Sequence, residues 1–531
     1  MLPGRTQDNT TPVSHSANAI PTAIRPPRRR IDRRVAATPP GSNGRGSRVE
    51  DALVPTSQLY VEDTVRNVHR FSLSMRWLLC ALALWLCIWV GEWLPRAAQL
   101  RTVAIVMLCG AVLLYRWHLA PFSSALVALC VLGFSSGAHA WHQQLHIVEG
   151  ECRGVATVRA DPTSRGYGVA TVLEFQKKRY KVMAYGSSGR HLVQRLVGES
   201  VLVVGECSVN EGTYSRFDRI NHVVGRMNVS SVSEMFSEGS MFVRAANRMR
   251  RSLVRGVESM PLGQRSLFTG LVIGDDRDQS PEMVQRFRAS GLSHLCAVSG
   301  QNVAYLLIVA SPLLKRRSKW VRWWFTILLL VWFVVLTRAE PSVLRASFMA
   351  AMVASNAALK SPANARVVLS RAVVMLLLID PMLAWSVGFA LSVGATAGLA
   401  WVSAGIGRLV GSRGVLAATL AAQLGTAPIS LIVFGFVPVI SLIANPLAIP
   451  VAGLVMTIGL PVALLASAVP ALVPLVSWLM MIPVAWVDGV SHVAAYVSPR
   501  GWWNGLLWTL VILGILVRFR RNARRHTAVA G

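Results

Sequence analysis

The feature that most constrains the fold is a series of long apolar runs that fills the second half of the chain. Hydrophobic residues make up 53% of the 531 residues, and charged residues only 15%. Because a helix needs about 20 predominantly apolar residues to cross a bilayer, such runs predict transmembrane helices. The predicted spans are Trp77–Leu94, Val103–Tyr115, Leu119–Ala138, Leu295–Leu314, Trp323–Thr337, Val343–Leu359, Val367–Ile379, Leu383–Val402, Val415–Phe436, Val439–Leu460, Val462–Met481 and Gly505–Val517.

One further apolar run, residues 484–497, is predicted to lie in the membrane interface. Asp488 and His492 stand one helical turn apart on it, and a charged pair is costly inside a bilayer. The sequence therefore predicts a polytopic α-helical membrane protein with about twelve spans, give or take two.

The charge distribution predicts the orientation. The chain has 54 Lys and Arg against 25 Asp and Glu, a net charge of +29. Cytoplasmic loops are enriched in Lys and Arg, so we assign five basic segments to the cytoplasm: a disordered arm (1–76), three loops (315–322, the loop around Lys360 and Arg366, and 407–413) and the tail (518–531). Three spans after the arm place the next polar segment outside the inner membrane. The excess charge also suits an anionic partner, either lipid headgroups or nucleic acid.

That polar segment, residues 150–232, has the pattern of a small β-domain. Five runs rich in Val and Tyr alternate with turns, and a short helix is predicted between the third and fourth. This order suits an inserted extracytoplasmic β-barrel of the OB type. Its second hairpin interleaves cations and aromatic rings, as OB-folds do on single strands, although a solvated charged hairpin would look the same. The candidate DNA-binding residues are Lys177, Lys178, Arg179, Tyr180, Lys181 and Tyr185.

Two cysteines lie in this β-domain. Cys152 and Cys207 fall in its first and fourth predicted strands, and an oxidising compartment permits a disulfide between them. Two free thiols are the alternative. The other five cysteines lie in apolar runs and are expected to be small buried residues.

The segment that follows, residues 240–293, is amphipathic. In "FVRAANRMRRSLVRGVESM" the apolar residues fall roughly on one helical face, and arginines surround the other. Such a helix is expected to lie in the membrane interface. From residue 294 to 517 the remaining spans form the predicted channel domain.

Polar side chains embedded in the apolar runs are the candidates for a path. Intramembrane polar residues usually face a bundle interior or a water-filled cavity. Each also has a simpler explanation: Asp380 can end a span, and Arg345 can extend toward the interface. Together they favour an aqueous route. The candidate path residues are His294, Ser299, Gly300, Asn302, Arg345, Asp380 and Gln423.

No motif for catalysis or metal binding stands out. The histidines form no HxH or HExxH pattern, and there is no GxxxxGK[ST], so we expect no metal, cofactor or nucleotide site. An intramembrane serine hydrolase built on Ser299 and His492 is the one catalytic alternative, and only the presence of one residue of each kind supports it. We therefore expect no enzyme.

Four segments carry a resemblance to the ComEC family of competence proteins. "GLVIGDDRDQSPEMVQRFRASGLSHLCAVSGQNVAYL" resembles the family's signature. Three more segments follow in the same order: "EPSVLRASFMA", "DPMLAWSVGFALSVGATAGL" and "QLGTAPISLIVFGFVPVISLIANPLAIP". The resemblance covers about residues 150–481 and includes the OB-like module. Gln301 and Asn302 differ from the Leu-His pair that more often follows Ser-Gly in this family.

The resemblance implies transport of one strand of transforming DNA across the cytoplasmic membrane. The expected partners are single-stranded DNA, membrane lipids, a DNA receptor outside, a helicase-type motor in the cytoplasm and a second copy of the chain. Some members carry a C-terminal metallo-β-lactamase-like domain, which this sequence lacks, so any nuclease is expected in another protein. The alternatives are a small-solute permease and a membrane scaffold that transports nothing.

Overall fold

The computed structural model describes residues 56–93, 120–143, 149–209, 215–296, 298–410, 414–499 and 501–529. Residues 1–64 and 65–531 form two separate compact units, and the fold described below is that of the second. The predicted span Val103–Tyr115 and most of the basic arm lie outside the described residues. Residues 56–76, predicted to be disordered, are instead helical, because the first span extends backwards into the long helix α1 (Thr56–Trp93).

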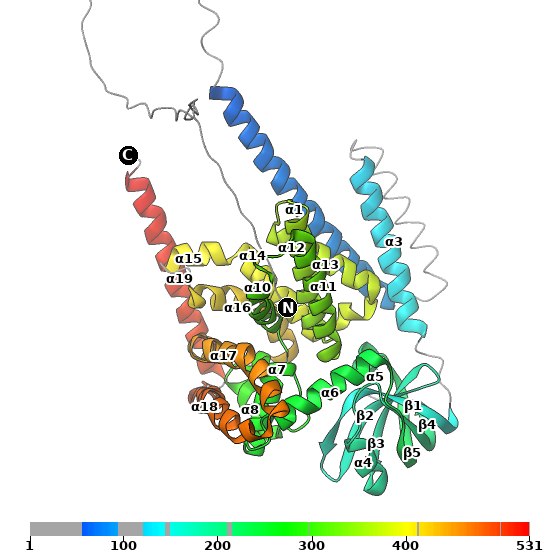
Figure 1. The fold of residues 1–531 in the computed structure, drawn as a ribbon. Helices are drawn as coiled ribbons and strands as arrows, with labels where there is room; N and C mark the ends of the chain where they lie inside the picture. The colour runs from blue at the N-terminus through cyan, green and yellow to red at the C-terminus, as the bar shows by residue number, and fades with distance from the viewer. Residues whose placement is uncertain are drawn as a thin grey trace, which may run out of the picture. The chain divides into compact units, whose positions relative to one another are not determined.

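The β-domain is a closed five-stranded barrel (Figure 1). The strand order around it is β1-β2-β3-β5-β4, and all neighbours are antiparallel except the pair β3 and β5. A short helix, α4, separates the third and fourth strands, as the sequence predicts. The elements are β1 (Gly150–Arg165), β2 (Gly168–Phe175), β3 (Lys178–Tyr185), α4 (Gly186–Val193), β4 (Ser200–Val209), α5 (Ser215–Ile220) and β5 (Val223–Ser237).

The barrel has its own apolar core. Successive side chains of a strand point to opposite faces, so every second residue enters the interior. Leu173 of β2, Tyr180 of β3 and Met227 of β5 are buried there. The same alternation places the polar residues of these strands on the outer surface.

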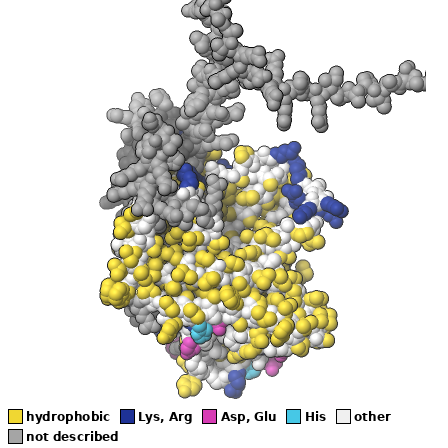
Figure 2. Space-filling view, turned by 90° about the vertical axis from the view of Figure 1, so that its left-hand side faces the viewer, with side chains coloured by type: hydrophobic (Ala, Val, Ile, Leu, Met, Phe, Trp, Pro, Cys, Tyr) yellow, Lys and Arg dark blue, Asp and Glu magenta, His cyan; other side chains and the backbone are white. Residues whose placement is uncertain are grey.

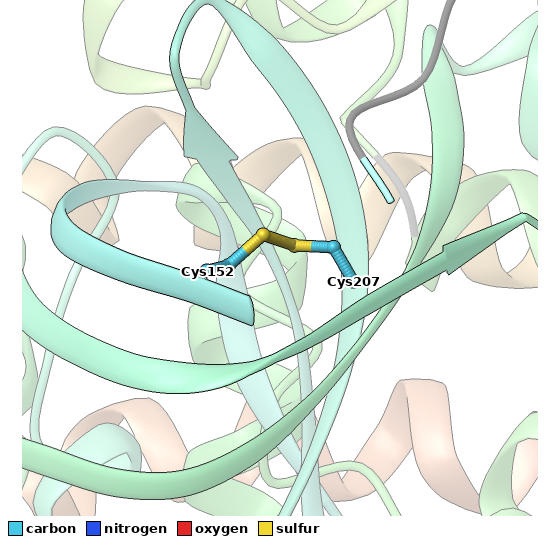
Figure 3. The surroundings of a disulfide bond; sticks show 2 residues. All are labelled: Cys152 and Cys207. Atoms are coloured by element: carbon cyan, nitrogen blue, oxygen red, sulfur yellow. A yellow bond between two sulfur atoms is a disulfide. The ribbon is translucent and has the colours of Figure 1, made fainter. Parts of the chain in front are cut away.

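A disulfide joins the first and fourth strands of the barrel. Cys152 of β1 and Cys207 of β4 are bonded, with their Cα atoms 5.9 Å apart (Figure 3). The two strands are direct neighbours, since Cys152 is paired with Gly205 and Gly150 with Cys207. The bond therefore fastens the strand pair that closes the barrel.

Removal of this disulfide is expected to weaken the barrel. The bond spans a sequence separation of 55 residues, for which the chain-entropy model gives a loss of about 4 kcal/mol in unfolding free energy. Pulse proteolysis of the Cys152→Ser, Cys207→Ser double variant in urea checks this. Its barrel should be cleaved at a lower urea concentration than that of the wild type. An unchanged midpoint would contradict the expectation.

Four short helices connect the barrel to the apolar helices. They are α6 (Met241–Arg255), α7 (Leu262–Ile273), α8 (Pro281–Ala289) and α9 (Ser293–Cys296). The apolar face of α6 was predicted to lie in the membrane interface, but it packs against other helices of the protein. Ala246, Leu253 and Val257 are buried in the same core as residues of α11 and α17.

The apolar helices form the rest of this unit (Figure 1). Backbones approach closely where α14 meets α16: a Cβ atom at Gly398 would lie 2.0 Å from the Ala421 carbonyl oxygen. Small residues permit such packing in membranes. The elements are α3 (Ala120–Gln143), α10 (Gly300–Leu314), α11 (Lys319–Leu336), α12 (Pro341–Ala358), α13 (Ala365–Ile379), the 3-10 helix η1 (Pro381–Trp385), α14 (Val387–Trp401), α15 (Ser403–Val410), α16 (Val415–Phe434), α17 (Ser441–Ala468), the 3-10 helix η2 (Pro470–Leu472), α18 (Val473–Val497) and α19 (Trp502–Val529).

Six segments of the described residues are long and apolar enough to cross a membrane: Leu73–Trp93, Ser124–His142, Lys319–Leu336, Val415–Phe434, Ser441–Ala468 and Pro470–Val497. Three shorter apolar helices are Gly300–Leu314, Val387–Trp401 and Trp502–Gly514. Neither group includes α12 or α13, where two spans were predicted, so the total of about twelve spans stays a prediction.

Residues 484–497, predicted to be a separate helix in the membrane interface, are the continuous second half of α18. Their position relative to the membrane stays a prediction. Asp488, whose charge suggested an interfacial position, forms an ion pair with Arg286 of α8. A paired carboxylate is tolerated within a packed bundle, so the helix need not end before it.

The surface agrees with a membrane environment. Figure 2 shows one face on which hydrophobic side chains form a broad continuous area, with Lys and Arg gathered at one edge. Large apolar residues are exposed along many helices, including Leu328, Ile432 and Trp478. Soluble proteins rarely expose apolar areas of this extent. The chain is a multi-pass membrane protein by this criterion, while its orientation stays a prediction.

Candidate nucleic-acid interface

The outer face of β3 carries part of the predicted DNA-binding set. Arg179, Lys181 and Tyr185 alternate along the strand and point outward, and 61% of Tyr185 is exposed. Tyr180 lies on the other face and is fully buried in the barrel core. Its prediction as a stacking platform was wrong, because the strand period of two directs it inward.

The cations of this hairpin are partly neutralised. Lys181 forms an ion pair with Asp218, and Arg179 lies 3.8 Å from Glu174. Lys177 is exposed in the turn between β2 and β3, where its φ is 64°. The hairpin therefore presents less net positive charge than its sequence suggests.

A second exposed tyrosine lies near Tyr185 and was missed by the sequence analysis. Tyr167 is fully exposed in the turn between β1 and β2. Its neighbour Gly168 is paired with Tyr185 across β2 and β3, so both rings are at the same end of the barrel. OB-folds bind oligonucleotides through this strand face and through the loop between the first two strands. The Gly-Tyr-Gly turn was the available signal.

The bundle brings four of the predicted path residues together. Arg345 of α12 is only 6% exposed, and its Nε donates to the Ser392 hydroxyl of α14 at 2.8 Å. None of the ion pairs among the described residues involves it. Gly300, the first residue of α10, faces the guanidinium: a Cβ there would lie 3.0 Å from Arg345 Nη2. Ser299 caps this helix by accepting from the Gln301 amide.

This arrangement leaves a buried positive charge without a counter-charge. The N-terminus of a helix carries a partial positive charge, and here Arg345 is next to it. Burial of an unpaired charge costs several kcal/mol, so a group of this kind indicates a site for an anion.

Asn302 also belongs to this group. It is buried, its Oδ1 accepts from the Ser299 hydroxyl at 3.2 Å, and its Nδ2 donates to the Leu271 carbonyl at 2.9 Å, which ties α10 to α7. The remaining predicted path residues lie elsewhere. Asp380 accepts from the Met382 amide and lies 3.1 Å from His222, in the turn between α5 and β5. Gln423 donates to the Ser441 hydroxyl.

His294 is exposed in the short helix α9. Among the contacts of the described residues, none joins Asp380, Gln423 or His294 to Arg345. The expected single lining of seven residues is therefore reduced to the group of Ser299, Gly300, Asn302 and Arg345, because the hydrogen bonds of the other residues go to different partners.

A buried ionic network fastens the barrel to the bundle. Arg250 of α6 is 2% exposed and contacts Asp161 of β1 and Asp275 at 3.2 Å each. It also donates to the Leu336 carbonyl at 3.1 Å. Arg338, between α11 and α12, contacts the same Asp161 carboxylate at 3.1 Å. Elements that are far apart in sequence thus share one set of charges.

Asp275 is ionised within this network. Burial acts to raise its pKa, but hydrogen bonds from Arg277 and the charge of Arg250 outweigh burial and hold the pKa below its usual range. The Asp275 carboxylate therefore stays negative at neutral pH and balances positive charge of the buried arginines. Nothing local in the sequence predicts these pairs, since Arg250 and Asp161 are 89 residues apart.

Comparison with known proteins finds a similarity in the second half of the chain. Residues 271–523 match the family model described as "Competence protein". These residues are called the competence segment below. This competence segment begins inside α7 and contains Asp275, Arg338, Arg345 and the α10 N-terminus.

A curated relative agrees with this assignment. The ComE operon protein 3 of Bacillus subtilis (strain 168) is 28% identical over 253 residues, which are 47% of this chain and 32% of the relative. The chain thus matches about a third of the length of that protein. No solved structure matches the chain.

Proposed function

We propose that this protein carries single-stranded DNA across the cytoplasmic membrane during DNA uptake, with the barrel outside and both termini in the cytoplasm. The observation that carries the proposal is the buried Arg345, which faces Gly300 and the N-terminus of α10 without a carboxylate partner. A DNA strand has one phosphate per nucleotide and cannot enter hydrocarbon. A buried cation beside a glycine, which has no side chain to block access to it, suits brief contact with successive phosphates.

The barrel supplies the first contact in this proposal. Tyr167 and Tyr185 stand exposed at one end, and Lys177 is exposed at the other end of the hairpin. Stacking on aromatic rings accepts any base, which suits DNA of arbitrary sequence. A small-solute permease has no use for such a surface. The protein itself is proposed to perform no chemistry, so a receptor, a motor and a nuclease would be separate partners.

The test is uptake of labelled DNA. A strain lacking this gene is complemented with the wild-type gene and given duplex DNA labelled in each strand separately. We expect one labelled strand in the cytoplasm of the complemented strain and none in the strain that lacks the gene. Equal cytoplasmic label in both strains would exclude transport, and loss of a small solute's uptake alone would favour the permease.

The two exposed tyrosines are expected to contribute strongly to strand binding. Tyr167→Ala and Tyr185→Ala should each reduce the affinity of the purified protein for oligothymidylate by about 5- to 150-fold, since a stacked base contributes ~1–3 kcal/mol. Fluorescence anisotropy measures this. The matched control is Tyr496→Ala, which removes an exposed tyrosine of α18 and should leave the affinity unchanged. Equal effects of the three substitutions would contradict a barrel site.

A further inference from the structure

Four arginines form a stripe along α6. Arg244, Arg248, Arg251 and Arg255 are spaced by four, three and four residues, which places them on one face of the helix. All four are exposed, whereas the opposite face packs in the bundle core. At 1.5 Å per residue the stripe is about 16 Å long.

The stripe forms one wall of a cleft of about 670 Å³. The barrel contributes Glu238 and residues of the connection between α4 and β4, including Gln194 and Glu199, and Arg277 also lines the cleft. Five arginines and two glutamates line the cleft, so three positive charges remain. Glu199 pairs with Arg251, and Asp275 with Arg277.

Arg244, Arg248 and Arg255 are the arginines of the cleft that have no carboxylate partner. In the part of the chain that the structure describes, none of the three forms an ion pair. Like charges four residues apart on a helix destabilise it by about 0.2–0.5 kcal/mol. A polyanion bound in the cleft would remove the repulsion between these arginines, so the stripe favours binding of a polyanion.

We propose that this cleft holds the phosphate backbone of a single DNA strand between the barrel and the competence segment. The inference rests on the proposed function and adds a site that the sequence analysis assigned to the membrane interface. At the ~3.4 Å rise per nucleotide of a stacked strand, the stripe reaches along about five phosphates. Arg277 belongs to the competence segment, so the cleft leads from α6 to that segment.

The concave form of the site favours a strand over a lipid surface. A bilayer presents a broad plane, which meets exposed convex surfaces, whereas a narrow chain can enter a hollow that protein walls on two sides. The ion pairs Arg250–Asp161 and Arg251–Glu199 hold α6 against the barrel, so they stabilise the two walls of the cleft.

The test is the salt dependence of strand binding. The full-length Arg244→Gln, Arg248→Gln variant is reconstituted in phosphatidylcholine nanodiscs and titrated with labelled oligothymidylate. Loss of two phosphate contacts should reduce the slope of log affinity against log salt by about 1.4. The affinity ratio between wild type and variant then falls about 7-fold from 50 to 200 mM salt. The matched control, Arg316→Gln with Arg317→Gln, removes two exposed charges after α10 and should keep the wild-type slope.

The outcomes separate the cleft from the proposed function. If the slope is unchanged in the variant and the wild type binds normally, the cleft is not a DNA site, but the proposed function stands. Failure of the wild type to bind or transport DNA overturns the proposed function. If the variant loses only its binding to phosphatidylglycerol vesicles, the stripe serves lipid and the inference is wrong. Arg244→Lys with Arg248→Lys keeps both charges and should restore the slope, which shows that charge and not misfolding causes the loss.

Discussion

Arg345→Glu is expected to abolish DNA uptake while the protein still inserts into the membrane. The substitution replaces the one buried cation of the Ser299–Gly300 group with a group that repels phosphate. Loss of a buried charge that contacts a phosphate costs about 2–5 kcal/mol of binding free energy. We therefore expect uptake to fall at least about 30-fold. The measurement is transformation frequency together with the amount of protein in the membrane. Normal uptake by this variant would exclude Arg345 from the path.

Arg345→Met separates a functional role from a structural one. If the arginine only supported the fold, its loss would destabilise the protein. Since the buried charge has no carboxylate partner, replacement by an apolar side chain of similar length should leave the melting temperature unchanged or raise it. We expect Arg345→Met to lose uptake without loss of stability. The control is Arg366→Met, which removes an arginine that donates to the Ala400 carbonyl, and which should preserve uptake.

Arg250→Met is expected to loosen the barrel from the bundle. The variant leaves Asp161 and Asp275 with one buried cation fewer, and breakage of a buried ion pair costs about 3–5 kcal/mol. Hydrogen exchange of the purified protein should become faster in β1 and α6. Arg248→Met, one exposed arginine of the same helix, should change stability by no more than about 0.5 kcal/mol. Equal exchange in both variants would show that the network does not hold the two parts together.

The barrel was predictable from sequence because its determinants are local. Alternating apolar residues set which side chains enter the core, and glycine-containing turns set the strand ends. The same alternation directs the Tyr180 side chain into the core, so its burial was also predictable. The apolar helices were likewise visible as runs, but the continuous α18 was not, because Arg286 neutralises Asp488 from more than 200 residues away.

The candidate site was only partly predictable for the same reason. Sequence selected Arg345 and Gly300 as unusual in apolar surroundings, and the structure adds that they face each other. The sequence also showed polar residues at Asn302, Asp380 and Gln423. Each of these side chains forms a hydrogen bond with another part of the protein, and the partners could not be read from the sequence. The arginine spacing on α6 was readable as a stripe, yet only the position of the barrel makes it a cleft wall.

The turn between α11 and α12 has a mechanical consequence. Arg338 and Ala339 both have positive φ values, of 61° and 56°, an uncommon backbone state that the ion pair of Arg338 with Asp161 helps to hold. The next helix, α12, begins at Pro341 and carries Arg345. A pulling force on a strand gripped by the barrel would therefore load this turn and reach α12 within seven residues. In the proposed function, tension on the DNA strand would then change the position of the Arg345 side chain.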